Sequence, residues 1–86
     1  MNKYKIVEVK WIDAQSSLDS ITLSELSKSK LAITNSCGYL IHEDKEKIIL
    51  GFMLFGVNWE GEDLIKHYQI IPKGMIKSIK QIKEIN

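Results

Sequence analysis

The longest apolar run in this sequence extends from Ile48 to Val57, with interruptions at Gly51 and Gly56. It is well short of the roughly 20 apolar residues that a membrane-spanning helix needs. Both faces of an extended segment here are apolar, so residues 47–55 predict a strand in the centre of a sheet or against an oligomer partner. A glycine inside such a strand lets a sheet curl, and this points to Gly51 as the bend.

The chain around this run has 86 residues, enough for one domain over residues 1–86 with a single modest core. Its 12 basic residues are all lysine and nearly balance the 11 acidic residues, for a net charge of +1. This composition excludes a disordered tail and a collagen-like chain. The first residues lack the hydrophobic segment of a secretory signal, so we expect a cytoplasmic protein with no membrane partner.

Alternation of apolar and polar residues predicts the first strand, over residues 3–11, with Val7, Val9 and Trp11 on one face. A polar loop over residues 12–20 follows it. After the loop, Thr22 and Glu25 have the spacing of a capping box and predict a short helix that ends near Lys28 or Ser29.

Three more segments have the composition of strands. Residues 30–42 contain Gly38, which predicts a bulge or a sharp bend, and a charged turn leads from them into the apolar run. Residues 64–71 alternate and end at Pro72. Residues 75–82 predict either a fifth strand or a terminal helix, because isoleucine recurs there every three residues, at Ile76, Ile79, Ile82 and Ile85.

These elements predict a mainly β protein. Five short strands with one short helix after the first fit a small, strongly bent sheet or barrel of the Sm-like type. Pro72 and Gly74 between the last two strands predict one helical turn there.

Three motifs in this order resemble a largely uncharacterised set of small proteins of bacteriophages and prophages. They are Trp11 to Ala14, the Gly38 to Asp44 stretch that contains GYLIHED, and Ile71 to Ile79, with the sequence IPKGMIKSI. One departure is the Ser- and Leu-rich stretch after Asp13, where an aromatic residue is expected. The resemblance implies a viral accessory protein with a small barrel, and it supplies no catalytic residues.

The residues themselves offer no catalytic constellation. His42 and His67 are the two histidines, and neither has the neighbours that a metal site or a general base requires, so we expect no metal, no cofactor and no enzyme activity. We expect His42 to be a solvated turn residue and His67 a half-buried strand residue. The lone Cys37 excludes an internal disulfide and is expected to be a small buried residue.

A basic stretch leaves nucleic-acid binding open as an alternative. Five lysines and no acidic residue lie between Lys66 and Lys83. Small barrels bind single strands with a basic groove and stacked aromatic rings. The lack of arginine and the small net charge favour a solvated lysine face instead.

Six residues are candidates for holding a small anionic ligand. They share aromatic, acidic or lysine character near predicted strand ends: Trp11, Asp13, Tyr39, Trp59, Tyr68 and Lys73. Trp11 fits the core equally well, and Asp13 fits a turn cap. Trp59 differs because its loop is polar and no apolar stripe accounts for it, which is typical of a contact residue or of a cap over the barrel end.

The hypothesis that follows is a non-enzymatic homo-oligomer that counters host antiviral defence by sequestering a nucleotide signal between subunits. Two alternatives stay open. One is an adaptor or inhibitor that binds a host or phage protein, and the other is a single-strand-binding barrel.

Overall fold

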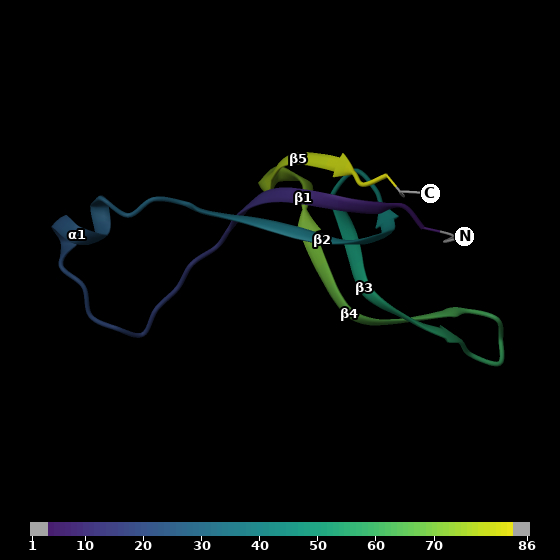
Figure 1. Cartoon of the computed structure of the whole chain (residues 1–86). Coiled ribbons are helices and arrows are strands. Elements are labelled where there is room, and N and C mark those ends of the chain that lie inside the picture. Colours follow the sequence, from purple (N-terminus) through teal and green to yellow (C-terminus); the bar gives the residue numbers. More distant parts are fainter. Residues whose placement is uncertain (1–3, 84–86) are drawn as a thin grey trace.

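The computed structural model describes residues 4–83, and one antiparallel sheet organises them (Figure 1). In chain order the elements are β1 (Ile6–Asp13), α1 (Leu23–Ser27), β2 (Ala32–Glu43), β3 (Lys47–Val57), β4 (Asp63–Pro72), η1 (Lys73–Met75) and β5 (Ile76–Gln81). The strand order is β4-β3-β2-β1-β5. The mainly β prediction with one short helix is confirmed, but β4 and β5 lie at opposite edges, so the sheet of one copy is open rather than a closed barrel.

The predicted elements agree with the observed ones to within a few residues. The Thr22 cap is present, because the Glu25 amide donates to Thr22 Oγ1 at 3.2 Å. Residues 76–81 form a strand rather than a terminal helix, and η1 is the helical turn predicted before it. The start of the predicted first strand at Lys3 and the last isoleucine of the series, Ile85, lie outside the described residues.

A small core lies against the inner face of β1, β2 and the first half of β3. Alternate residues of β1 are buried as predicted, and they pack with apolar residues of β3 and β4; the core consists of Val7, Val9, Trp11, Ile48, Leu50 and Ile71. The indole N–H of Trp11 donates to Ser36 Oγ at 3.0 Å, so the one polar atom of this ring is satisfied. Trp11 is therefore a core residue and not an exposed ligand contact.

Two glycines in neighbouring strands allow close packing of the bent sheet. A Cβ on Gly51 would lie 2.7 Å from Ile65 Cγ2, and one on Gly38 would lie 3.0 Å from the Phe52 ring. The bulge of β2 lies at Ile41, not at Gly38, because the β2–β3 register shifts between Leu40 and His42. The Gly38 bulge prediction is wrong: this glycine pairs regularly with Val7 and gives room to an aromatic ring.

Two segments extend away from the sheet in opposite directions (Figure 1). We call residues 14–31, which contain α1, the excursion, and residues 52–68, the outer part of β3 and β4 with their turn, the apical hairpin. The hairpin begins just beyond Gly51, the last buried residue of β3. His67, which lies in β4 where the hairpin meets the sheet, has a φ of 56°. The Tyr4 hydroxyl donates to Asp63 Oδ2 and ties the hairpin to the start of the chain.

These two segments make the molecule long. Its extents are 54 × 30 × 25 Å and its radius of gyration is 16.8 Å, whereas a compact chain of this length has a radius near 12 Å. Its accessible surface of 7311 Å² exceeds the about 5,200 Å² expected for a compact monomer of this mass by about 2,100 Å². One copy therefore leaves uncovered a surface that a globular protein of this size would bury.

Candidate interaction surfaces

Trp59 is held at the tip of the apical hairpin by a braced turn. Asn58 Oδ1 accepts hydrogen bonds from the amides of Glu60 at 3.0 Å and Glu62 at 2.9 Å. Gly61 occupies the left-handed region, with φ 86°, which a turn of this shape needs. The side chain of Trp59 is 99% exposed. It is therefore not a cap over the sheet within one copy, and the contact-residue interpretation from the sequence gains support.

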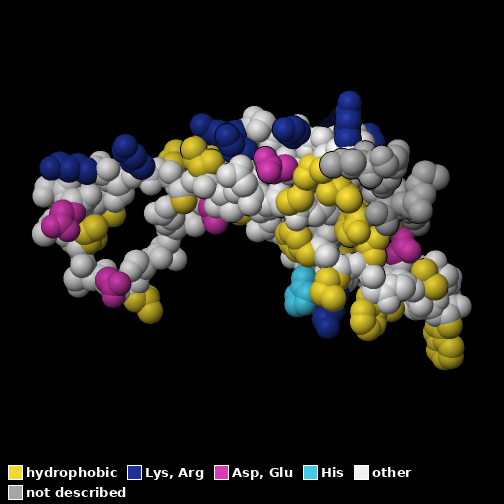
Figure 2. Space-filling view, viewed as in Figure 1, with side chains coloured by type: hydrophobic (Ala, Val, Ile, Leu, Met, Phe, Trp, Pro, Cys, Tyr) yellow, Lys and Arg dark blue, Asp and Glu magenta, His cyan; other side chains and the backbone are white. Residues whose placement is uncertain are grey.

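The rest of the apical hairpin is apolar on both faces. Its exposed apolar and aromatic side chains are Phe52, Met53, Leu54, Phe55, Val57, Leu64 and Tyr68. Figure 2 shows such side chains projecting at the end that carries the β3–β4 turn. Lys66 Nζ lies 5.7 Å from the centre of the Phe55 ring, which places one cation beside this surface. Exposed apolar side chains gathered on one segment in this way are typical of an interaction site.

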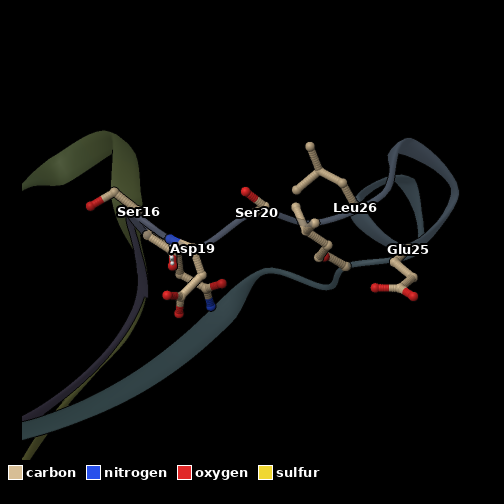
Figure 3. A pocket seen from close by; sticks show the side chains of 9 residues that line it. Ser16, Asp19, Ser20, Glu25 and Leu26 are labelled. Atoms are coloured by element: carbon tan, nitrogen blue, oxygen red, sulfur yellow. Dashed lines mark hydrogen bonds between the residues drawn. The ribbon is translucent and has the colours of Figure 1, made fainter.

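The excursion carries a second uncovered surface. Every residue from 14 to 31 is exposed, and α1 buries none of its side chains. Between loop and helix lies an open recess of about 440 Å³. Figure 3 shows Ser16, Asp19 and Ser20 on the loop side and Glu25 and Leu26 on the helix side. Together with Ile21, these residues give the recess a mixed apolar and polar lining.

The other predicted ligand residues are dispersed. Asp13 ends β1 and lines a separate recess of about 240 Å³ beside Lys30 and Leu31. Lys73 Nζ is paired with Glu43 Oε2 at 2.9 Å. Tyr39 is half-buried in β2, whereas Tyr68 is exposed in the hairpin.

The six candidates thus lie in the core, within β2, at the hairpin, at the start of the excursion and beside the β2–β3 turn. One copy does not assemble them into a single pocket within the part of the chain that is described.

The β2–β3 turn is organised by Asp44, a residue that the sequence interpretation treated only as part of a charged turn. Asp44 Oδ2 lies 2.8 Å from both Lys47 Nζ and His42 Nε2, and Oδ1 accepts from the Glu46 and Lys47 amides. The Lys47 ammonium, His42 and these amides hold the pKa of Asp44 well below its usual range, and Asp44 in turn raises the pKa of Lys47. The Asp-x-x-Lys spacing in a turn was the available sequence signal.

Two predictions about titratable side chains are wrong. Cys37 is exposed, because it lies opposite Glu8 on the outer face of β1 and β2, while its neighbour Ser36 faces inward to Trp11. His67 is exposed rather than half-buried. His42, as expected, is an exposed residue next to the turn.

The lysines of the basic stretch lie in different surroundings. Lys66 lies beside an aromatic ring, Lys73 is ion-paired, and Lys80 of β5 pairs in register with Glu8 of β1. An acidic residue therefore pairs with Lys80 near the end of β5, which weakens the case for a continuous phosphate-binding groove. Single-strand binding stays a prediction with no added support.

Residues 4–83 contain no group of three or more His, Cys, Asp or Glu side chains that could hold a metal ion. Within the same residues, neither helix has the length and apolar content to cross a bilayer. Comparison with protein-family models, with curated proteins and with solved structures finds no match to this chain.

Proposed function

We propose that this chain is a non-enzymatic binding protein whose working form is a homo-oligomer, with its ligand site between subunits. The observation that carries the proposal is the surface excess of about 2,100 Å² over a compact monomer. Obligate oligomers bury surfaces of this order, and symmetric copies of one chain are the commonest way to cover them.

The dispersed ligand candidates fit a site shared by two copies. Asp13 lies where β1 ends and the excursion begins, whereas Trp59 lies in the turn of the apical hairpin, and the two segments extend from the sheet in opposite directions (Figure 1). These two residues therefore come together only if one copy presents its hairpin to another. A closed, barrel-like arrangement of the Sm type likewise requires a neighbouring copy, because β4 and β5 are free edges in one copy. The resemblance to phage proteins directs the search for a ligand to nucleotide signals of host defence.

Native mass spectrometry of the protein purified from bacteria with active nucleotide signalling tests both parts. The expected spectrum shows one discrete oligomer that carries a few hundred daltons per site, released on denaturation. A panel of cyclic and linear nucleotides in a thermal-shift assay follows, since a ligand at 100 times its Kd adds about 2.7 kcal/mol to stability.

The two parts fail separately. A discrete oligomer that no nucleotide stabilises would reject the nucleotide ligand and leave the oligomer in place. A monomer at micromolar concentration would reject the oligomer and shift the weight to the adaptor alternative, with Trp59 as the contact for a different protein.

A further inference from the structure

We propose that two copies of this chain pair about a two-fold axis, with the apical hairpin of each copy covering the excursion of the other. In this arrangement Trp59 of one copy enters the recess between the loop and α1 of its partner. The inference rests on the proposed homo-oligomer and specifies which surfaces form it.

The excursion needs a cover because no other segment of residues 4–83 buries any of its side chains. Its helix has five residues, all exposed, and isolated helices shorter than about 12 residues are marginal in water. The Thr22 cap satisfies only one of its free amides. Its apolar side chains are among the most exposed in the molecule, with Leu18 at 107%, Leu23 at 81% and Leu31 at 72%. An ordered segment of this composition is expected to pack against another apolar surface.

The apical hairpin supplies a surface of that kind, and its shape matches. A two-stranded hairpin without a covering layer is marginal by itself, and this one carries Phe55 and Val57 at 65% and 61% exposure. Its end protrudes as a single indole on a braced turn, whereas the excursion presents a recess with Ile21 and Leu26 in its wall. The residues that contribute most to the stability of protein interfaces are enriched in tryptophan and lie in well-packed pockets.

The position of the two surfaces favours a reciprocal dimer. They lie at opposite ends of an elongated molecule (Figure 1), so two copies placed side by side in opposite directions bring both pairs of surfaces together at once. A two-fold contact of this kind closes on itself and leaves neither surface free. If the dimer buries the surface excess of about 2,100 Å² on each copy, it buries about 4,000 Å² of accessible surface in total. This area falls within the range of obligate dimers.

Site-directed cross-linking tests the pairing. In a Cys37→Ser background, which removes the native thiol, one variant carries Glu60→Cys beside Trp59 and another carries Ser20→Cys in the recess. After the two purified variants are mixed and allowed to exchange subunits, a short bis-maleimide is expected to yield a covalent dimer that joins position 60 to position 20. Each variant alone is expected to remain uncoupled, because neither brings two like positions together.

Three results would overturn the arrangement. Coupling of the Glu60→Cys variant to itself would show that two hairpins pair with each other. A non-covalent dimer in light scattering that gives no coupled product in the mixture would point to the free strand edges instead, and would leave the proposed homo-oligomer standing. A monomer in light scattering would reject the oligomer and the pairing together.

A second variant checks the role of Trp59 without relying on thiols. Trp59→Ala is expected to weaken the dimer by at least about tenfold, as hot-spot residues do. Its control is Lys45→Ala, an exposed residue of the β2–β3 turn outside both surfaces, which is expected to leave the dimer unchanged. An unchanged dimerisation constant for Trp59→Ala would remove the indole from the interface.

Discussion

The part of the sheet that surrounds the core, which we call the base, differs from the apical hairpin and the excursion in how its apolar side chains are covered. At the base, Leu50 and Ile71 are fully buried between strands, while a few residues further along the same strands Leu54 and Leu64 face solvent. The base is a core in its own right, whereas the apical hairpin and the excursion each leave their apolar side chains exposed, and the proposed dimer would pack them against each other. The number of apolar side chains in a segment therefore indicates how much apolar surface has to be removed from water. It does not indicate whether the same chain or a second copy buries that surface.

The largest expected difference between the base and the apical hairpin comes from truncating one leucine in each. Leu50→Ala is expected to lower the free energy of unfolding by about 3 kcal/mol, because it leaves a cavity in the only core of the described residues. Leu64→Ala, in the apical hairpin, is expected to cost less than about 1 kcal/mol at concentrations where the protein is monomeric. Urea denaturation at low protein concentration measures both, and equal losses would break the distinction between base and extension.

A pair of glycine substitutions probes the boundary between the two regions. Gly51→Ala is expected to destabilise the fold by about 2 kcal/mol, because its Cβ would meet Ile65 and Ile41 at 2.7 and 2.8 Å. The control is Gly74→Ala in η1, where no atom lies within 4 Å of the added carbon. Thermal unfolding of both variants decides the matter. A Gly51→Ala protein as stable as its control would mean that the hairpin is not packed against β2 at this point.

A substitution at the N-cap of α1 tests whether the stability of this helix affects the stability of the whole fold. Thr22→Ala removes the acceptor of the Glu25 amide and is expected to destabilise the helix by about 1 kcal/mol. Because α1 buries nothing, global unfolding is expected to shift by less than about 0.5 kcal/mol. Amide exchange of residues 25–28 reports the first quantity, and denaturation the second. Thr22→Ser, which keeps the hydroxyl, serves as the control, and a large global loss would show that the excursion belongs to the core.

The smallest expected effect concerns acid stability at the β2–β3 turn. The pKa of Asp44 is depressed in the folded protein, so its carboxylate stabilises the fold above the ordinary aspartate pKa of about 3.9 and this contribution is lost as the pH falls below it. Asp44→Asn is therefore expected to flatten the fall in melting temperature between about pH 4 and pH 2. Asp19→Asn in the excursion makes the same charge change without these hydrogen bonds. The prediction fails if both variants show the same acid profile as the unaltered protein.

The sequence predicted the base of the sheet well because local patterns determine it. Alternation placed Val7, Val9 and Trp11 inward, and the Thr22–Glu25 spacing located α1. It failed where the answer depends on register between strands. Cys37 was expected inside, yet the pairing of Ser36 with Val9 turns the adjacent side chain outward.

The candidate site was less predictable than the fold. Exposure of Trp59 followed from its polar loop, and the two apolar faces of residues 47–55 predicted a strand either in the centre of a sheet or against an oligomer partner. No local pattern shows that the β3–β4 strands continue beyond the core, so the sequence did not decide between these two positions. The other ligand candidates lie in different parts of the molecule, and their positions depend on tertiary contacts that cannot be read from the individual residues; these candidates are Asp13, Tyr39, Tyr68 and Lys73.

The pairing of β1 with β5 means that the sheet can be completed only after the last strand has been synthesised. Val9 lies opposite Ile79, so the first strand waits for one of its two partners until nearly the whole described chain has been translated. At about 5–20 residues per second this interval lasts several seconds. Throughout it, β1 has one bare edge beside a nascent apolar sheet. During this interval Lys10 of β1 has a protective role, because charged side chains along a bare strand edge discourage pairing with the wrong chain. In the finished sheet β5 is the edge strand, and its Lys77 and Lys80 take over this role.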